Sequence, residues 1–361
     1  MKYILTNLLF YCFSLVVFKQ PVHKNTAPIR GTWVTNVGSD ALLSKENVQA
    51  TVALCKAKGL NTIFVVVWNG GYTMYPSEVV KKHIGVAQDP LYKGFDPIAA
   101  IVEEGHRAGL QVHAWFEFGF SYAYQDSNSI WAKKYPHWLS KDVQGKPLQK
   151  SQFYWFNAMH PEVQNFMTSM VLEVVKKYKV DGIQGDDRLP AMPAEGGYDD
   201  YTKKLYFTQT KRNAPADCRE AHWLQWKSDQ LSAYGKRLYL AVKKQNPKCL
   251  VTWSPSIYPW SKEQYLQDWP AWVKGSYVDY VLPQLYRYKI EAYEEQLKAL
   301  VSQIPAKQQH RFYPGILTSL ANGYQVSDTM FQQMISLNRK YGFNGECLFY
   351  FECLKKMGTI Y

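Results

Sequence analysis

The chain lacks the short motifs of several large enzyme classes. It contains no Gly-x-Ser-x-Gly elbow, no phosphate-binding P-loop and no Gly-x-Gly-x-x-Gly stretch, which argues against serine-hydrolase and nucleotide-dependent chemistry. Its 8 histidines include no pair at metal-ligand spacing, and the first strand-like run, at 30–37, has no His-x-His. We therefore expect neither a metal nor a cofactor. His113, early in a later strand, is expected to be a hydrogen-bonded core residue.

Cysteine is scarce and irregularly spaced. Beyond Cys12, the spacing of the remaining cysteines matches neither a zinc site nor a disulfide framework. Cys55, Cys249 and Cys347 fall inside apolar helix or strand patterns, so we expect buried free thiols there.

Acidic residues are outnumbered by basic ones, and the formal net charge is +12. Most lysines and arginines lie singly along helical patterns, which is typical of solvated faces. A basic balance favours a polyanionic partner such as an acidic glycan or a cell wall. No zinc-finger, RNA-recognition or basic-helix signature occurs, so we expect no nucleic-acid partner.

Long apolar runs are confined to the N-terminus. Lys2 precedes an apolar segment over 8–18 whose length suits a secretory signal, although no small-x-small cleavage site follows it. We read residues 1–20 as a signal peptide or a membrane anchor, and the protein as exported to the periplasm or cell envelope. No other run is long and apolar enough to span a membrane.

The rest of the chain alternates between strand-like and helical patterns. Strand-like runs occur at 30–37, 60–68, 110–118, 180–186, 249–255, 278–286, 311–317 and 345–352. Helical periods lie between them at 45–58, 95–108, 161–178, 219–245, 262–273, 291–303 and 327–340. Nearly continuous apolar strands separated by helices predict a (β/α)8 TIM barrel as a single domain over 28–361, with the last outer helix short or absent. A doubly wound open sheet is the alternative.

The connections after the third and fourth strands, 119–160 and 188–218, are long and rich in aromatic residues. Both leave from the carboxyl ends of strands, where a TIM barrel carries its chemistry. Loops of this length in a compact domain are usually functional or disordered, and the aromatic content argues against disorder.

The most informative stretch is 180–187, an apolar, glycine-punctuated run that ends in Asp186 and Asp187. A strand buried on both faces has no structural need for acids at its tip, because an uncompensated buried charge costs several kcal/mol. The alternative reading is an aspartate that caps the following turn. The strand period directs Asp186 into the barrel mouth, and the third and eighth strands end in Glu117 and Glu352.

Converging carboxylates in an aromatic cup predict glycoside hydrolysis, with one protonated acid and one ionised nucleophile or base. Glu117 is the preferred partner of Asp186, because its apolar neighbours would raise its pKa, whereas Arg188 would counteract that rise. Asp187 and Glu352 are the other candidate partners. The expected glycan-binding residues are Trp33, Asn36, Trp68, Trp115, Gln184, Arg188, Trp253, Gln284 and Tyr286. Carbohydrate binding without catalysis, and glycan transfer that excludes water, are the alternatives.

Several blocks resemble one known family. Arg30-Gly31-Thr32-Trp33, Phe95-Asp96-Pro97, His113-Ala114-Trp115-Phe116, His160-Pro161-Glu162-Val163, Asp181-Gly182-Ile183 with Asp186-Asp187, and Pro283-Gln284-Leu285-Tyr286 occur in that order. This pattern is similar to the glycosyl hydrolase-like 10 family of bacterial barrel proteins, related to a divisome-localised peptidoglycan glycosidase. The resemblance implies an exported glycosidase acting on cell-wall glycan strands. It also implies that Asp186 and Asp187 are the paired acids and that Gln284 and Tyr286 form the Pro-Gln-x-Tyr motif.

The chain departs from the family pattern at two places in the expected cup. Glu117-Phe118-Gly119 stands where the family usually has Asn-Pro, and Gly185-Asp186-Asp187-Arg188 replaces Phe-Asp-Asp-Tyr. The extra acid and extra cation indicate a subfamily with an altered substrate.

Overall fold

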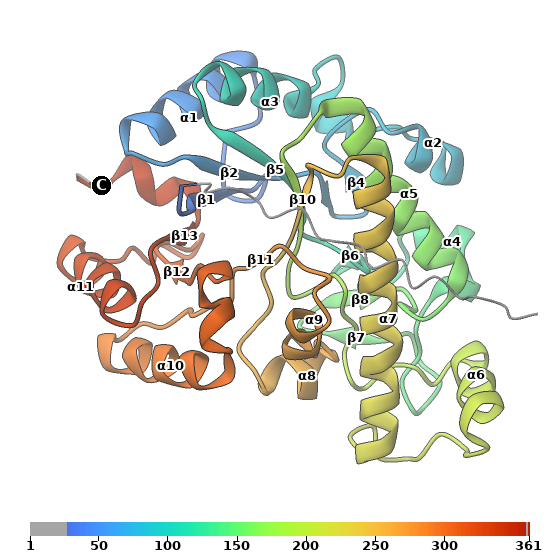
Figure 1. The fold of residues 1–361 in the computed structure, drawn as a ribbon. Coiled ribbons are helices and arrows are strands. Elements are labelled where there is room, and N and C mark those ends of the chain that lie inside the picture. The colour runs from blue at the N-terminus through green and yellow to red at the C-terminus, as the bar shows by residue number, and fades with distance from the viewer. Residues whose placement is uncertain (1–26, 359) are drawn as a thin grey trace, which may run out of the picture.

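Eight parallel strands form the centre of the molecule (Figure 1), and the computed structural model describes residues 27–358 and 360–361. The barrel strands are β1 (Arg30–Val34), β2 (Thr62–Val66), β5 (Gln111–Phe116), β9 (Gly182–Gly185), β10 (Leu250–Trp253), β11 (Tyr280–Val281), β12 (Gly315–Leu317) and β13 (Glu346–Phe349). They are ordered β11-β10-β9-β5-β2-β1-β13-β12. Parallel bridges from Val281 to Phe312 and from Gln284 to Gly315 join the two remaining edges. The predicted TIM barrel is confirmed.

Helices surround this sheet on the outside. The α-helices are α1 (Lys45–Ala57), α2 (Glu78–Ile84), α3 (Pro97–Arg107), α4 (Ile130–Lys134), α5 (Pro161–Tyr178), α6 (Asp200–Thr210), α7 (Ala221–Gln245), α8 (Trp260–Tyr265), α9 (Trp269–Lys274), α10 (Ile290–Gln303) and α11 (Asp328–Lys340). Four 3-10 helices complete the set: η1 (Pro90–Tyr92), η2 (Pro136–Trp138), η3 (Ala306–Arg311) and η4 (Phe351–Lys355). The short η4 is the element that follows β13.

The single helix predicted over 262–273 is wrong, because the structure divides this segment into α8 and α9. Leu266 adopts a left-handed conformation with φ of 63°, which ends α8. Pro270 stands in the first turn of α9, where its missing N–H leaves no hydrogen bond unmade. Apolar periodicity continued across this break, so it did not reveal the two helices.

Local signals explain the other helix boundaries. The side chains of Ser44, Asp96 and Ser327 accept hydrogen bonds from backbone N–H groups in the first turns of α1, α3 and α11. Gly59 and Gly109 have φ of 75° and 74°, and these left-handed residues turn the chain from a helix into the next strand.

The barrel interior is filled with aromatic and polar side chains. The ring of Trp33 lies 5.8 Å from that of Phe64, which in turn lies 4.9 Å from the imidazole of His113. His113 is buried as expected, but neither ring nitrogen finds a hydrogen-bond partner among the described residues, so the expectation of a hydrogen-bonded histidine is wrong. Burial lowers the pKa of His113 to about 4, so the imidazole is neutral at pH 7.

The long connections contain regular structure. Residues 119–160 include α4, η2 and the antiparallel strands β6 (Ser121–Tyr124), β7 (Gln149–Lys150) and β8 (Phe153–Trp155), in the order β6-β8-β7. Residues 188–218 include α6. After β2 the chain makes a short hairpin of β3 (Trp68–Asn69) and β4 (Tyr72–Thr73). All three additions follow the carboxyl ends of barrel strands and therefore surround the barrel mouth.

Within the described ranges, no helix has the length and apolar character needed to cross a bilayer. The predicted export segment over 1–20 lies outside the described residues. Cys55, Cys249 and Cys347 are buried free thiols, as predicted.

Candidate active site

Two neighbouring strands deliver acids to the same point at the barrel mouth. β5 and β9 are paired in register so that Phe116 lies opposite Gly185. The next residues, Glu117 and Asp186, therefore leave the two strands side by side. Asp187 follows directly on the chain.

The guanidinium of Arg188 lies among these three carboxylates. Its Nη2 is 3.5 Å from Asp186 Oδ2 and 3.8 Å from Glu117 Oε1, and its Nη1 is 3.4 Å from Asp187 Oδ1. Arg188 Nε donates to the backbone carbonyl of Glu117 at 2.7 Å, and the guanidinium packs over the ring of Phe153 at 4.8 Å. Burial lowers the pKa of Arg188, but the three neighbouring carboxyl groups together raise it further, so the guanidinium remains charged.

The shared nitrogen limits how far apart two of these carboxylates can be. The separation of Asp186 Oδ2 and Glu117 Oε1 cannot exceed the sum of their two distances to Nη2. That limit is below about 9.5 Å, the upper end of the separations found between the two acids of glycosidases. The geometry therefore permits a catalytic carboxylate pair.

Asp186 is the most deeply buried acid of the cluster, with 3% of its side chain exposed. Burial raises its pKa well above the usual range, as do the charges of Asp187 and Glu117, whereas Arg188 opposes the rise. Its oxygens accept hydrogen bonds from Trp115 Nε1 at 3.1 Å and from the backbone N–H of Arg188 at 2.9 Å. These contacts all donate to the carboxylate, so they favour its ionised form.

Glu117 is also largely buried, and this burial raises its pKa, against the lowering effects of Arg188, Thr35 and Asn69. Its Oε2 accepts hydrogen bonds from Thr35 Oγ1 at 3.0 Å and from Asn69 Nδ2 at 2.8 Å. The sequence reasoning missed both donors. Their signal was available, because each is a polar residue at the end of an apolar strand-like run.

The predicted ligand residues Trp33, Trp115 and Gln184 form the floor below the acids. Trp33 Nε1 donates to Gln184 Oε1 at 2.6 Å, and the rings of Trp33 and Trp115 lie 6.5 Å apart. All three side chains are buried. Gln184 Nε2 has no hydrogen-bond partner within the described chain. These residues support the acids from below.

Three other predicted residues are half-buried at the mouth. Asn36 Oδ1 accepts a hydrogen bond from Asn69 Nδ2 at 3.0 Å, next to Glu117. Gln284 Nε2 donates to the carbonyl of Ser254 at 3.0 Å. The ring of Tyr286 packs 5.1 Å from that of Phe349. Burial and the facing acids raise the pKa of Tyr286 well above its usual range, so its hydroxyl keeps its proton.

Trp68 and Trp253 are corrections to the predicted set of glycan-binding residues. Both are fully buried. The Trp68 ring packs against Trp131, and its Nε1 donates to the carbonyl of Gly119 at 3.0 Å. The Trp253 ring packs 5.8 Å from Trp272 of α9. Both side chains face the outer layers, because the alternation of a strand sends every second residue away from the barrel axis.

Glu352 is a further correction, since the structure does not bring it into the acid cluster. It lies in η4, where it accepts a hydrogen bond from Ser39 Oγ at 2.6 Å and pairs with Lys355 at 2.8 Å. β13 ends at Phe349, so the chain turns away before it reaches Glu352.

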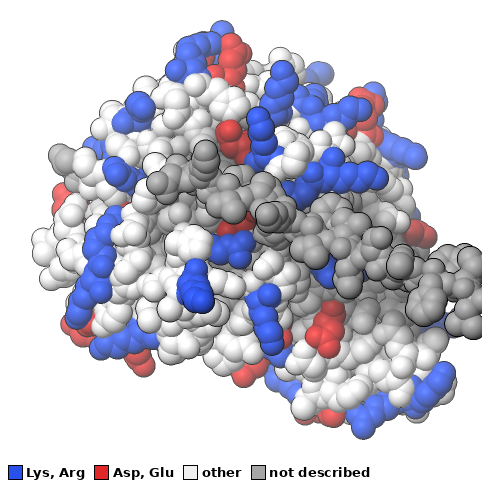
Figure 2. Space-filling model, viewed as in Figure 1, with Lys and Arg blue, Asp and Glu red and all other residues white. Residues whose placement is uncertain are grey.

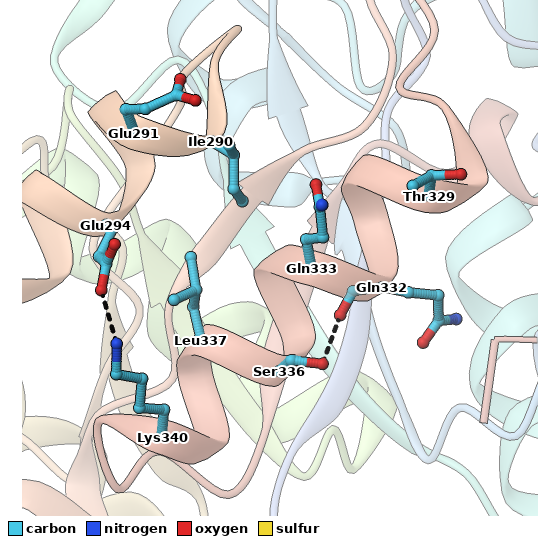
Figure 3. Close-up of a pocket in the computed structure, with 9 residues that line it drawn as sticks. All are labelled: Ile290, Glu291, Glu294, Thr329, Gln332, Gln333, Ser336, Leu337 and Lys340. Atoms are coloured by element: carbon cyan, nitrogen blue, oxygen red, sulfur yellow. Dashed lines mark hydrogen bonds and ion pairs between the residues drawn. The ribbon is translucent and has the colours of Figure 1, made fainter.

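A cavity of about 640 Å³ lies away from the acids, between α10 and α11 in the outer layer. Figure 3 shows its polar lining, with Lys340 paired to Glu294 at 2.9 Å, and the apolar side chains of Ile290 and Leu337 between the helices. Its two carboxylates, Glu291 and Glu294, follow one another on the same helix and are not joined by a shared cation as Glu117 and Asp186 are.

Basic side chains occupy several separate places on the face shown in Figure 2, among neutral and acidic residues. That distribution agrees with solvated helix faces. The acid cluster, not a basic surface, therefore remains the candidate site.

Comparison with known proteins gives a family. The glycosyl hydrolase-like 10 family model matches residues 28–335. The glycosyl hydrolase DigH of Escherichia coli (strain K12) is 24% identical over 304 residues, spanning 73% of this chain and 66% of that protein. The glycosyl hydrolase YngK of Bacillus subtilis (strain 168) is 23% identical over 293 residues, spanning 72% of this chain and 54% of that protein. The match thus covers less than two thirds of the length of these curated relatives.

Solved structures share the fold. The PgaB (BpsB) glycoside hydrolase domain from Bordetella bronchiseptica superposes with a TM-score of 0.68 at 14% identity, over 91% of this chain and 95% of that chain. The catalytic domain of β-amylase from Paenibacillus polymyxa gives 0.61 at 12% identity, over 91% and 94%. At these identities the likeness establishes a barrel architecture of the kind found in glycoside hydrolases.

Proposed function

Because this chain belongs to the glycosyl hydrolase-like 10 family, we propose that it hydrolyses glycosidic bonds in glycan strands of the bacterial cell wall. The observation that carries the proposal is the pair of acids, Glu117 and Asp186, held by one nitrogen of Arg188. Cleavage of a sugar–sugar bond needs two carboxyl groups at such a separation. The names of the curated relatives agree with this reaction.

The pair divides the two catalytic roles. Burial raises the pKa of both carboxyls, so the pair holds one proton more readily than two isolated acids would. Arg188 Nη2 lies nearer to Asp186, at 3.5 Å, than to Glu117, at 3.8 Å, and on this ground we assign the proton to Glu117, against the stronger effect of burial on the pKa of Asp186. Glu117 then protonates the leaving oxygen, and Asp186 acts as nucleophile or as base for water.

Neighbouring groups would position the sugar. The protonated hydroxyl of Tyr286 and the amide of Asn36 lie half-buried at the mouth, where they can donate to sugar hydroxyls. Arg188, which lowers the pKa of Asp186, would help to keep that carboxylate ionised while Glu117 carries the proton. The same proposal places the protein outside the cytoplasm, in the periplasm or cell envelope, because the apolar segment after Lys2 has the length of a secretory signal.

Carbohydrate binding without hydrolysis is the second candidate. It is favoured by the ion pair between Asp186 and Arg188, since a carboxylate that is both buried and paired is less available to a substrate. Both candidates use the same mouth and the same class of ligand.

The deciding experiment is digestion of purified glycan strands, prepared from cell-wall sacculi by removal of the stem peptides. We expect the full chain to generate new reducing ends, identified by reduction with borohydride and mass spectrometry. Asp186→Asn should remove that activity, whereas Asp40→Asn, at an exposed carboxylate paired with Lys355, should not. Strand binding without new ends in the wild type would establish the second candidate instead.

A further inference from the structure

Exposed aromatic side chains lie on two opposite sides of the barrel mouth. One group follows β2 and β5, and the other follows β11 and β12. In the order of the barrel these two pairs of strands are half a turn apart. In Figure 1, β4 and β6 lie to the right of the barrel strands, whereas α10 and α11, which follow β11 and β12, lie to the left.

On the first side, the β3–β4 hairpin and β6 enclose a cavity of about 250 Å³. It is lined by aromatic and small residues together with one acid: Gly70, Tyr72, Tyr122, Tyr124, Asp126 and Trp131. Tyr124 is 47% exposed, and the buried hydroxyl of Tyr122 has no hydrogen-bond partner in the described part of the chain. The cavity is smaller than the about 300–1,000 Å³ of pockets that take a whole drug-sized ligand. It suits one ring of a longer molecule.

The opening of this cavity depends on the two glycines at the hairpin turn. Gly70 and Gly71 have φ of 61° and 82°, the left-handed conformation that a tight hairpin needs at both central positions. A side chain at Gly71 would meet the backbone carbonyl of Tyr122 at 2.6 Å. The turn therefore holds the hairpin close against β6.

On the second side, Tyr288 and Tyr324 form an edge-to-face pair with ring centroids 4.9 Å apart. Tyr288 has a large aromatic side chain and is 61% exposed. The buried hydroxyl of Tyr324 lacks a hydrogen-bond partner among the described residues. Flat rings with unused hydroxyls fit a ligand that offers apolar faces rimmed by hydroxyl groups.

The acids lie between the two aromatic groups. Gly70 of the cavity is bonded to Asn69, whose side chain donates to Glu117. On the far side of the acids, Tyr286 packs on Phe349 and precedes Tyr288 by two residues. Polar and aromatic side chains thus lie on both sides of the acids, Asn69 toward the cavity and Tyr286 toward the tyrosine pair.

We propose that the mouth binds a linear glycan chain from the hairpin cavity to the Tyr288–Tyr324 pair, so that cleavage occurs inside the chain and not at its end. This inference rests on the proposed function and adds its mode of action. A ligand that ends at the acids would leave one aromatic group unused. A chain that crosses the mouth uses both.

The test compares long and short fractions of the same peptide-free glycan strands. We expect the wild type to shorten long strands by internal cuts before single repeat units appear. Tyr288→Ala and Tyr124→Ala should each lower kcat/KM on long strands by about tenfold, since an aromatic stacking contact is worth roughly that factor. Both variants should cleave the shortest substrate fraction at the wild-type rate.

Leu240→Ala is the matched control, because Leu240 is 55% exposed on the outer helix α7. It should match the wild type on every fraction. Release of single repeat units from the first time point would overturn the inference. So would a Tyr288→Ala defect of equal size on short and long fractions.

If the wild type cleaves neither fraction, binding of the same two fractions is measured by calorimetry. Tighter binding of long strands that Tyr288→Ala and Tyr124→Ala abolish would uphold the chain path while refuting hydrolysis. Equal binding of both fractions would refute the chain path. Failure of the path and failure of the proposed hydrolysis are thereby distinguished.

Discussion

Asp186→Asn should raise the thermal stability of the protein while it removes the activity. Asparagine has nearly the shape of aspartate, and its Oδ1 can keep the hydrogen bond from the backbone N–H of Arg188. Its Nδ2 replaces the oxygen that accepts from Trp115 Nε1, so that one hydrogen bond is lost. The substitution removes a negative charge that is almost wholly excluded from water. Arg188 keeps Glu117 and Asp187 as partners, so its own charge is not left alone.

The gain in stability follows from the balance of two effects. Desolvation of a buried carboxylate costs several kcal/mol, and the pairing with Arg188 at 3.5 Å returns only part of it, which is why the pKa of Asp186 is raised. The hydrogen bond lost at Trp115 costs about 1–3 kcal/mol, which is less than the desolvation that is relieved, so we expect a net gain of about 1–2 kcal/mol. For a domain of this size that corresponds to a rise in Tm of about 2 °C.

The way the Tm difference changes with pH independently checks that Asp186→Asn stabilises the protein. A carboxyl group whose pKa is raised in the folded state destabilises that state when it is ionised. This loss of stability is relieved as the pH falls towards the pKa of the carboxyl group in the unfolded state, about 3.9. Asparagine does not titrate. The difference in Tm between Asp186→Asn and the wild type should therefore shrink as the pH is lowered from 7 to about 4.

Differential scanning calorimetry across this pH range measures the stability, and release of reducing ends measures the activity. Turnover should fall by about 10²–10⁴-fold or more. Asp187→Asn is the neighbouring control for stability, since its side chain is 27% exposed and its charge is not desolvated to the same degree. A fall of several degrees in the Tm of Asp186→Asn, with turnover unchanged, would refute the reasoning and make Asp186 a structural ion-pair partner.

Three further variants probe other parts of the molecule. Glu117→Gln should lower kcat on glycan strands by about 10²–10⁴-fold but spare an aryl glycoside whose leaving group needs no proton, and paired rate measurements check this. Lys227→Met should destabilise the protein by about 1–3 kcal/mol in chemical denaturation, because the buried ammonium donates to three backbone carbonyls of the 188–218 segment. Burial lowers the pKa of Lys227 from 10.5 to about 7. The stability of the wild type should therefore increase as the pH is raised through this range, whereas that of Lys227→Met should not. Arg339→Met leaves the fully buried Glu346 without its ion-pair partner, and calorimetry should show a loss of about 3 kcal/mol with kcat unchanged below the transition.

The architecture was predictable from the chain itself. Apolar runs at regular spacing, with caps such as Asp96 and Ser327 and left-handed glycines such as Gly59, indicated eight strand–helix units with correct boundaries for most elements. These signals are local, so they do not depend on what the segment later packs against. The division of α8 from α9 was missed where apolar periodicity continued across a break. The helices α2, α4 and α6, which lie in the connections after barrel strands, were not predicted, and the run at 278–286 forms a strand only over Tyr280–Val281.

The strand period also placed Asp186 and Glu117 at the mouth, because the alternation of side chains and the register of β5 with β9 determine which residues emerge together. It could not tell which aromatic residues face the mouth. Trp253 ends β10 and Trp68 lies two residues beyond β2, yet both turn to the outer layers, and only their neighbours Trp272 and Trp131 reveal this.

The electrostatics of the cup were decided by the tertiary structure alone. Arg188 was visible beside the acids in the sequence, but its place among three carboxylates, with Thr35 and Asn69 donating to Glu117, depends on residues far apart in the chain. A pKa is set by burial and by charges within a few ångströms, and both are properties of the folded state. The sequence by itself determined that acids would gather at the carboxyl ends of the strands. The tertiary structure determined the distances between these acids and the residues that contact them.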